Sequence, residues 1–123
     1  MVALLRGDSS AADYIADLES REVPTATTPV NAYELFVGAW RSTRSEVNLR
    51  EAAGLLRDLP ILSYDIDAAF QIARIHSTLS RRGELIGVED EFIAGIAVRY
   101  GEQLITRNLS HFRRVPGLDA VSW

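Results

Sequence analysis

Cysteine and lysine are both absent from the 123 residues of the sequence. Without cysteine the chain has no disulfide framework and no thiolate chemistry, a composition that suits a reducing cytoplasm. Without lysine it cannot contain a P-loop, in which a lysine contacts the phosphates. It also cannot be a pyridoxal enzyme, in which a lysine forms a Schiff base with the cofactor. All 13 basic residues are arginine, which reflects either genome composition or the suitability of guanidinium groups for phosphate.

Long hydrophobic runs are absent too. No apolar segment approaches the ~20 residues that span a bilayer, and the opening MVALLRGD is too short for a signal peptide. We therefore expect a cytoplasmic protein with no membrane partner. The net charge of -4 means that any nucleic-acid contact must come from a local patch. With 47% hydrophobic residues the chain can form a core, and we expect one domain over residues 1–123.

Capping residues and glycines divide most of the chain into helices. Thr28 is followed by Pro29, a capping hydroxyl before a proline at the first helical position. In the first part of the chain, Ala12, Ile15 and Leu18 recur at helical spacing and are expected to face the core. The predicted N-caps are Asp8 or Ser9, Thr28, Ser45 and Asp65, and the last two long helices are predicted to end at Gly83 and Gly101.

Short apolar segments lie between these helices. Four of them are predicted as strands, at 23–29, 60–63, 103–106 and 120–123. Short strands that alternate with helices are typical of a parallel sheet covered on both faces, so we expect the α/β class. In such a sheet the ligand site lies at the carboxyl ends of the strands.

Three acids, Glu89, Asp90 and Glu91, stand at the predicted start of the helix that ends at Gly101. Acids in a first helical turn are favoured by the helix dipole and need no further role. Alternatively they hold a cation, because carboxylates that share one pocket repel each other unless a cation is bound. Both interpretations remain open at this point.

Glu34 and Asn108 are two further candidates. Glu34 lies in an otherwise apolar helix, where it is either buried with a partner or placed at the border of the apolar face and in water. Asn108 follows the predicted strand 103–106, where a turn residue is also common. Together with Asp90 they carry the oxygen ligands that Mg²⁺ prefers.

The chain has two histidines, His76 and His111. His76 is expected to pack, or to extend toward solvent, on its own helix rather than to bind a ligand. No HExxH pattern occurs in the sequence, which excludes a zincin metalloprotease.

Three segments together resemble the PIN-domain ribonucleases, and among these the VapC-type toxins of toxin–antitoxin pairs. They are TATTPVNAYELFVGA, IGVEDEFIAGIAVRYGEQLITRN and HFRRVPGL. Each is similar to a loose family motif, and their order and spacing fit over nearly the whole chain. The resemblance implies a PIN-like three-layer α/β fold, with a central parallel sheet flanked by helices, and a Mg²⁺- or Mn²⁺-dependent endoribonuclease.

The resemblance also implies roles for single residues. Glu34 matches the Glu of the family's Glu-Leu helix, and Asp90 matches the Asp of its Asp-x-x-Ile-Ala helix start, so both are implied metal ligands. Asn108 stands at a position that is Asn or Asp in relatives and completes the implied catalytic set, and Thr106 matches the Thr two residues before it. His111 stands where many relatives carry Asp, a departure that either weakens the metal site or changes only a neighbouring contact.

The start of the chain departs most from the family. Relatives begin with a short apolar strand that ends in Asp-Thr or Asp-Ser, whereas MVALLRGD resembles the helix that follows that strand. We therefore expect the sheet to lack its first strand and the metal site to lack one carboxylate. Our interpretation is that the start was placed too late in the gene.

Two functions from different classes follow. The first is a ribonuclease toxin that hydrolyses RNA phosphodiester bonds with a metal-activated water. The alternative is a catalytically inactive PIN-like binding module that engages an antitoxin but does not cut RNA, which the expected loss of the first strand and His111 both favour. A phospho-receiver domain would require a lysine near a late strand, and the chain has none.

The resemblance implies three partners: an RNA substrate, a cognate VapB-like antitoxin and a second copy of the chain in a homodimer. The apolar helices around Trp40 and Leu55 are candidate faces for the protein partners. Four arginines are candidate contacts with the RNA backbone, and equally candidates for solvated surface or antitoxin contacts. They are Arg41, Arg44, Arg81 and Arg82.

Overall fold

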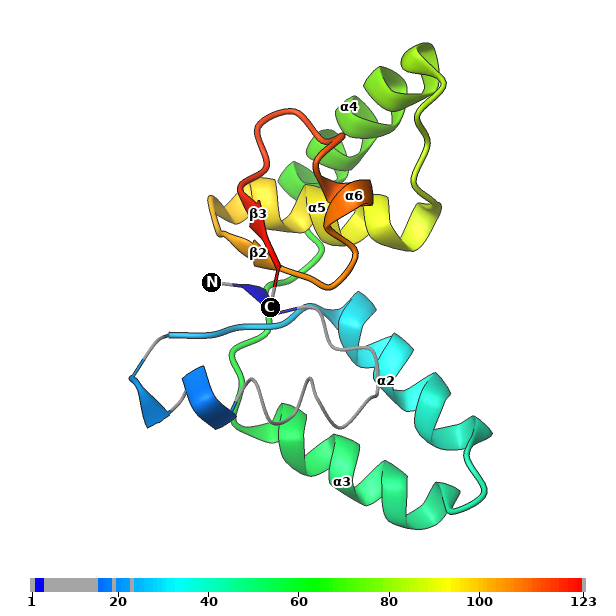
Figure 1. The fold of residues 1–123 in the computed structure, drawn as a ribbon, viewed down its shortest axis with the longest axis vertical. Coiled ribbons are helices and arrows are strands. Elements are labelled where there is room, and N and C mark those ends of the chain that lie inside the picture. Colours follow the sequence, from blue (N-terminus) through cyan, green and yellow to red (C-terminus); the bar gives the residue numbers. More distant parts are fainter. Residues whose placement is uncertain (1, 4–15, 19, 23, 123) are drawn as a thin grey trace.

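The computed structural model describes residues 2–3, 16–18, 20–22 and 24–122, and its longest helices lie above and below a small sheet (Figure 1). The strands are β1 (Val2–Ala3), β2 (Leu104–Ile105) and β3 (Ala120–Val121). The helices are α2 (Pro29–Arg41), α3 (Ser45–Arg57), α4 (Ile66–Arg82), α5 (Val88–Tyr100) and the short α6 (Leu109–Phe112).

All strands of the described sheet are parallel, with β2 between β1 and β3. Leu104 lies opposite Val2 on one side and Ala120 on the other. The side chains of Leu104 and Ile105 are fully buried, as expected for a parallel strand covered by helices. The predicted α/β class with a parallel sheet is confirmed.

The first strand corrects one expectation. The chain was expected to begin inside a helix and the sheet to lack its first strand, yet Val2–Ala3 lie in register beside β2. This position gives the backbone groups of β2 a partner on that side, which a helix could not provide. Residues 4–15, including the predicted caps Asp8 and Ser9, lie outside the described residues, whereas Leu18 is buried as predicted.

Two of the predicted strands are reduced to a single contact. Segments 23–29 and 60–63 meet at an isolated parallel bridge between Thr27 and Ile61. The Thr27 amide donates to the Pro60 carbonyl at 2.9 Å, and the Leu62 amide donates to the Thr27 carbonyl at 2.8 Å. Prolines in both segments cannot donate to a ladder, which limits the pairing to this bridge. The prediction of two strands was therefore wrong here, because the described residues form only this bridge, although the two segments do lie side by side.

The predicted N-caps of α2 and α4 are confirmed, and so are the predicted ends of α4 and α5. The Thr28 hydroxyl and the Asp65 carboxylate accept from the amides three residues later, at 3.1 and 2.8 Å. Gly83 and Gly101 end their helices in the left-handed conformation, both at φ 65°, which glycine adopts without strain. Ser45 was wrongly predicted as a cap: it is the first residue of α3, and Arg44 precedes it without a capping side-chain bond.

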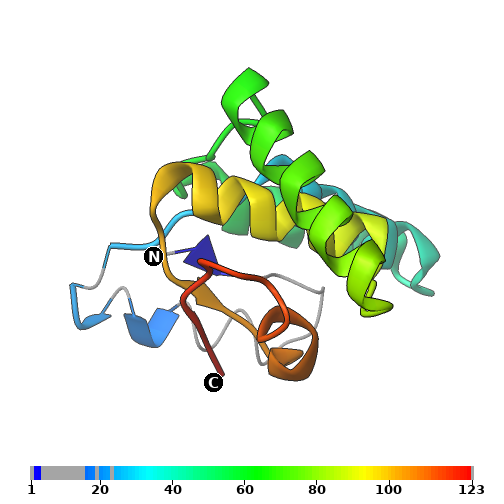
Figure 2. The ribbon, with the colours of Figure 1, turned by 90° about the horizontal axis from the view of Figure 1, so that it is seen from above.

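The largest core lies between α4, α5, β2 and α6. Figure 2 shows α5 running along one side of the sheet, with α4 beyond it. The two helices approach closely because Gly95 of α5 lies against Ile72 of α4. No helix in the described part of the chain is long and apolar enough to cross a membrane. The core residues are Ile75, Leu79, Ile86, Ile93, Ala94, Ala97, Leu104, Phe112 and Val115.

A smaller core joins α2 and α3. It consists of Leu35, Ala52 and Leu59, with Leu55 partly buried against them. The side chain of Trp40, at the end of α2, is 68% exposed. Glu34, one residue before Leu35, lines a pocket together with the start of α5.

Candidate active site

Glu34 and Asp90 line the same pocket, although they lie 56 positions apart in the sequence. The pocket has a volume of about 380 Å³ and lies where α2 meets the first turn of α5. We call it the acidic pocket. Its lining residues are Glu34, Ile86, Gly87, Val88, Glu89 and Asp90. The structure therefore brings together the two predicted metal ligands, and their role as ligands stays a prediction.

The three acids at the start of α5 have separate environments. All three lie in the first turn of α5, where the helix dipole favours acids, and the N-cap residue Gly87 makes no side-chain capping bond. Glu89 is exposed, whereas Asp90 and Glu91 are 7% and 3% exposed. The Glu91 carboxylate lies 2.9 and 3.1 Å from Nδ1 of His76, so it faces α4. Asp90 is thus the buried acid of this triplet that lines the acidic pocket.

His76 was expected to pack or to extend toward solvent on its own helix. Its side chain is in fact half exposed and joined to Glu91 across the α4–α5 contact. The two residues are 15 positions apart on different helices, so helical spacing could not have revealed the pair. The contact accounts for the buried Glu91 carboxylate, which would otherwise lose its hydration without compensation.

Asn108 is connected to Asp90 through His111. Nδ1 of His111 lies 3.3 Å from Oδ2 of Asp90 and 2.8 Å from Nδ2 of Asn108. The backbone N–H of Asn108 donates to the hydroxyl of the fully buried Thr106, at 2.9 Å. Thr106 therefore orients the turn that carries Asn108, and the histidine places these residues around the carboxylate of Asp90. The sequence pointed to His111 only through its departure from the family motif.

The donors suit a hard divalent cation, because Mg²⁺ is commonly held by one or two carboxylates with water completing its shell. Glu34 and Asp90 can supply those carboxylates, and Oε2 of Glu34 is buried. Among the described residues, no group of three or more His, Cys, Asp or Glu side chains is arranged to hold a metal ion. The described residues thus offer the two carboxylates of Glu34 and Asp90, and no larger group of ligands, at this pocket.

Comparison with known proteins identifies the family of this chain. Residues 1–118 match the PIN domain family. The chain belongs to the PIN domain family. Over 94 residues, this PIN domain is 36% identical to a protein of Salmonella typhimurium named tRNA(fMet)-specific endonuclease VapC, covering 76% of this chain and 71% of the relative. It is 35% identical to a Haemophilus influenzae protein named ribonuclease VapC, again over 94 residues that cover 76% of this chain and 71% of the relative.

Solved structures extend the similarity over the whole PIN domain. A chain in the DNA-bound VapBC of Salmonella typhimurium superposes with a TM-score of 0.88 at 27% identity, covering 99% of this chain and 97% of that chain. A chain in the DNA-bound VapBC2 of Rickettsia felis superposes with a TM-score of 0.84 at 23% identity, covering 100% and 99%. The second likeness bears on the fold alone.

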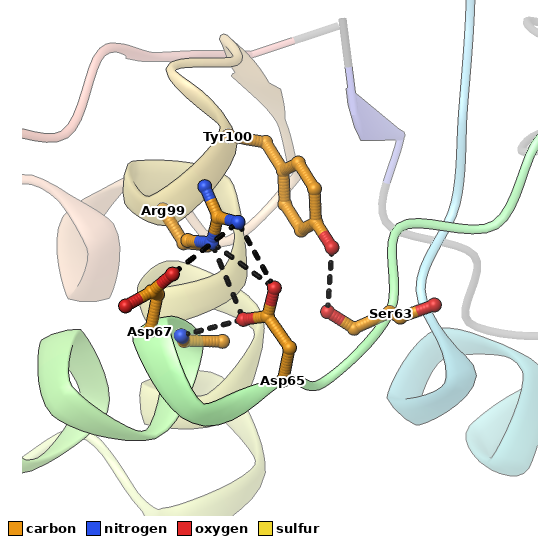
Figure 3. Close-up of polar contacts among 6 residues, drawn as sticks. Ser63, Asp65, Asp67, Arg99 and Tyr100 are labelled. Carbon is orange, nitrogen blue, oxygen red and sulfur yellow. Dashed lines mark hydrogen bonds and ion pairs between the residues drawn. The ribbon is translucent and has the colours of Figure 1, made fainter.

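The PIN domain also contains an ion pair that the sequence did not predict. Arg99, in the last turn of α5, binds Asp65 through Nη2 at 3.0 Å and Nε at 3.2 Å, and approaches Asp67 at 3.5 Å (Figure 3). The hydrogen bond from Arg99, with the Ala68 amide, lowers the pKa of Asp65. The same bond raises the pKa of Arg99. Asp65 had been assigned only as a cap, because its partner lies 34 positions away.

Proposed function

We propose that this PIN domain is an endoribonuclease toxin of the VapC type, which hydrolyses RNA phosphodiester bonds with Mg²⁺ or Mn²⁺. The single observation that carries the proposal is the shared pocket of Glu34 and Asp90. Their oxygens match the ligand preference of these cations. The names of the VapC relatives, one an endonuclease and one a ribonuclease, support the same reaction class.

The mechanism assigns different tasks to the pocket residues. Asp90 and Glu34 would hold the ion, which when bound would supply an activated water and offset charge on the phosphate. His111 orients the Asp90 carboxylate when its Nδ1 is protonated and donates across the 3.3 Å contact. In the other tautomer the same nitrogen accepts from Nδ2 of Asn108 at 2.8 Å. Burial of Asp90 reduces competition from water and strengthens its interaction with a cation.

RNA and protein partners require surfaces outside the pocket. Arg41, Arg44, Arg81 and Arg82 are all exposed and can meet phosphates. We propose a VapB-like antitoxin as partner, since the chain that is 27% identical to this one was solved in a VapBC complex. We further propose a homodimer, and the exposed Trp40 makes the end of α2 a candidate contact. An RNA substrate also favours a cytoplasmic location.

A second candidate is a PIN-like module that binds an antitoxin without cutting RNA. The contact between His111 and Asp90 favours it, because an imidazole beside the carboxylate competes with a cation for the same oxygen. The two candidates differ in one measurable property, metal-dependent cleavage.

Cleavage of labelled structured RNA in Mg²⁺, with EDTA as control, tests the proposal. We expect Asp90→Asn to abolish cleavage while Glu91→Gln, which alters the adjacent acid facing α4, retains it. Melting curves for both variants show whether folding is intact. Cleavage that persists in Asp90→Asn contradicts the metal site, and a folded wild-type protein that cuts no RNA supports the binding module.

A further inference from the structure

A second pocket lies next to the acidic pocket and is lined by aromatic side chains. Its volume is about 390 Å³, and we call it the aromatic pocket. Glu89 lines both pockets, so the two share a wall. The aromatic pocket is lined by Pro29, Val30, Tyr33, Tyr64, Glu89 and Phe92.

The aromatic rings of this pocket remain accessible. The side chains of Tyr33 and Tyr64 are 57% and 49% exposed. The rings of Tyr64 and Phe92 lie 5.5 Å apart between centroids and are tilted by 49°, so Phe92 supports one edge of Tyr64 and leaves much of it uncovered. Accessible rings of this kind provide surfaces on which a planar group can stack.

The backbone on both sides of Tyr64 is fixed to α5. The hydroxyl of Tyr100 donates to the carbonyl of Ser63 at 3.1 Å, and Arg99 binds the carboxylate of Asp65 (Figure 3). Asp65 also caps α4. Tyr64 therefore presents a half-exposed ring from a segment that is already ordered, which lowers the entropy lost when a ligand binds.

We infer that the aromatic pocket holds a nucleobase of the RNA next to the phosphate that is cut in the acidic pocket. The inference rests on the proposed ribonuclease function. Nucleobases stack on aromatic side chains irrespective of their sequence, and single-stranded RNA exposes its bases for such stacking. Among the described residues that line the aromatic pocket, Glu89 is the one charged group. Its carboxylate repels phosphate, so the pocket favours a base over the RNA backbone.

Binding of labelled oligoribonucleotides tests the inference without requiring cleavage. The Asp90→Asn protein is titrated into an oligoribonucleotide and into copies that carry one abasic nucleotide at successive positions. With Tyr64 present, we expect one abasic position to weaken binding by about tenfold. In the Tyr64→Ala protein that position should no longer matter, whereas Tyr64→Phe, which keeps the ring, should retain the full difference.

Phe70→Ala is the control, because Phe70 is an exposed aromatic residue that does not line the pocket. It should leave the abasic effect unchanged. Light scattering after gel filtration distinguishes a protein occupant: if Tyr64→Ala dissociates an oligomer and no abasic position weakens binding, the pocket is a protein interface and the inference is wrong.

Cleavage assays separate this inference from the proposed function. Both proposals are supported if the wild-type protein cuts the oligoribonucleotide and an abasic substitution slows cleavage by about tenfold. The slowing should occur with wild type and with Tyr64→Phe, and not with Tyr64→Ala. Cleavage with no abasic effect at any position overturns the base subsite alone. Absence of cleavage together with a Tyr64-dependent abasic effect on binding overturns the ribonuclease and retains the base subsite.

Discussion

His111 lies between Asp90 and Asn108: its Nδ1 is 3.3 Å from Oδ2 of Asp90 and 2.8 Å from Nδ2 of Asn108. Asp90 comes from the first turn of α5, and the other two residues come from the segment after β2. The imidazole thus stands at the position from which a carboxylate at residue 111 would approach Asp90.

Replacing this imidazole with a carboxylate should strengthen Mg²⁺ binding. His111→Asp places a second acid beside Asp90, so the two negative charges repel each other in EDTA and are offset when the ion is bound. We expect a lower melting temperature than wild type in EDTA and a larger rise on addition of Mg²⁺. His111→Asn is the uncharged control, and an equal Mg²⁺ response from the two variants would show that the added charge does not reach the ion.

Glu34 provides the test of the second ligand. Glu34→Gln keeps the size of the side chain and removes its charge, so we expect weaker Mg²⁺ affinity by calorimetry and at least a tenfold loss of RNA cleavage at limiting Mg²⁺. Glu46→Gln alters an exposed acid on α3 and should change neither quantity. Unchanged affinity in Glu34→Gln would remove Glu34 from the metal site even if Asp90 is essential.

Structural features that depend on residues close together in the sequence could be predicted from it. Thr28 and Asp65 cap their helices as expected, because a cap depends on residues three positions apart. Glu34 and Asp90 were placed together by their motifs and by the edge of a parallel sheet. By contrast, the His76–Glu91 pair joins separate helices, and no local pattern specifies which helices pack together.

The ion pair between Asp65 and Arg99 should make stability depend on pH. Because Arg99 lowers the pKa of the Asp65 carboxyl, the charged form is favoured in the folded state. The stabilisation is present above the unfolded pKa, and it is lost as the pH falls through the lowered folded pKa. Asp65→Asn keeps a capping side chain and removes the charge, so its melting temperature should fall below wild type at neutral pH.

The difference between wild type and Asp65→Asn should shrink below about pH 4, where the carboxylate of the unfolded chain is protonated. Thermal melts monitored by circular dichroism from pH 7 downward measure it. Asp65→Ala removes the cap as well and should stay below Asp65→Asn throughout. A constant gap between wild type and Asp65→Asn at every pH would show that the ion pair does not stabilise the fold.

The close approach of α4 and α5 depends on Gly95. A Cβ at this position would overlap Cγ1 of Ile72 and lie 3.0 Å from its Cα and backbone nitrogen, and the backbone atoms cannot rotate away. We expect Gly95→Ala to lower the free energy of urea unfolding by about 1–3 kcal/mol, as overpacking of a core typically does.

Gly38 in α2 provides the matched control, since a Cβ there meets no atom of the described residues within 4 Å. Gly38→Ala should raise the free energy of unfolding by roughly 1 kcal/mol, because alanine favours the helix more than glycine does. Opposite signs for the two substitutions would establish that the α4–α5 contact, rather than helix propensity, determines the effect at Gly95. Stabilisation by both would mean that the two helices can separate without cost, and then the first turn of α5 could not hold Asp90 rigidly in the acidic pocket.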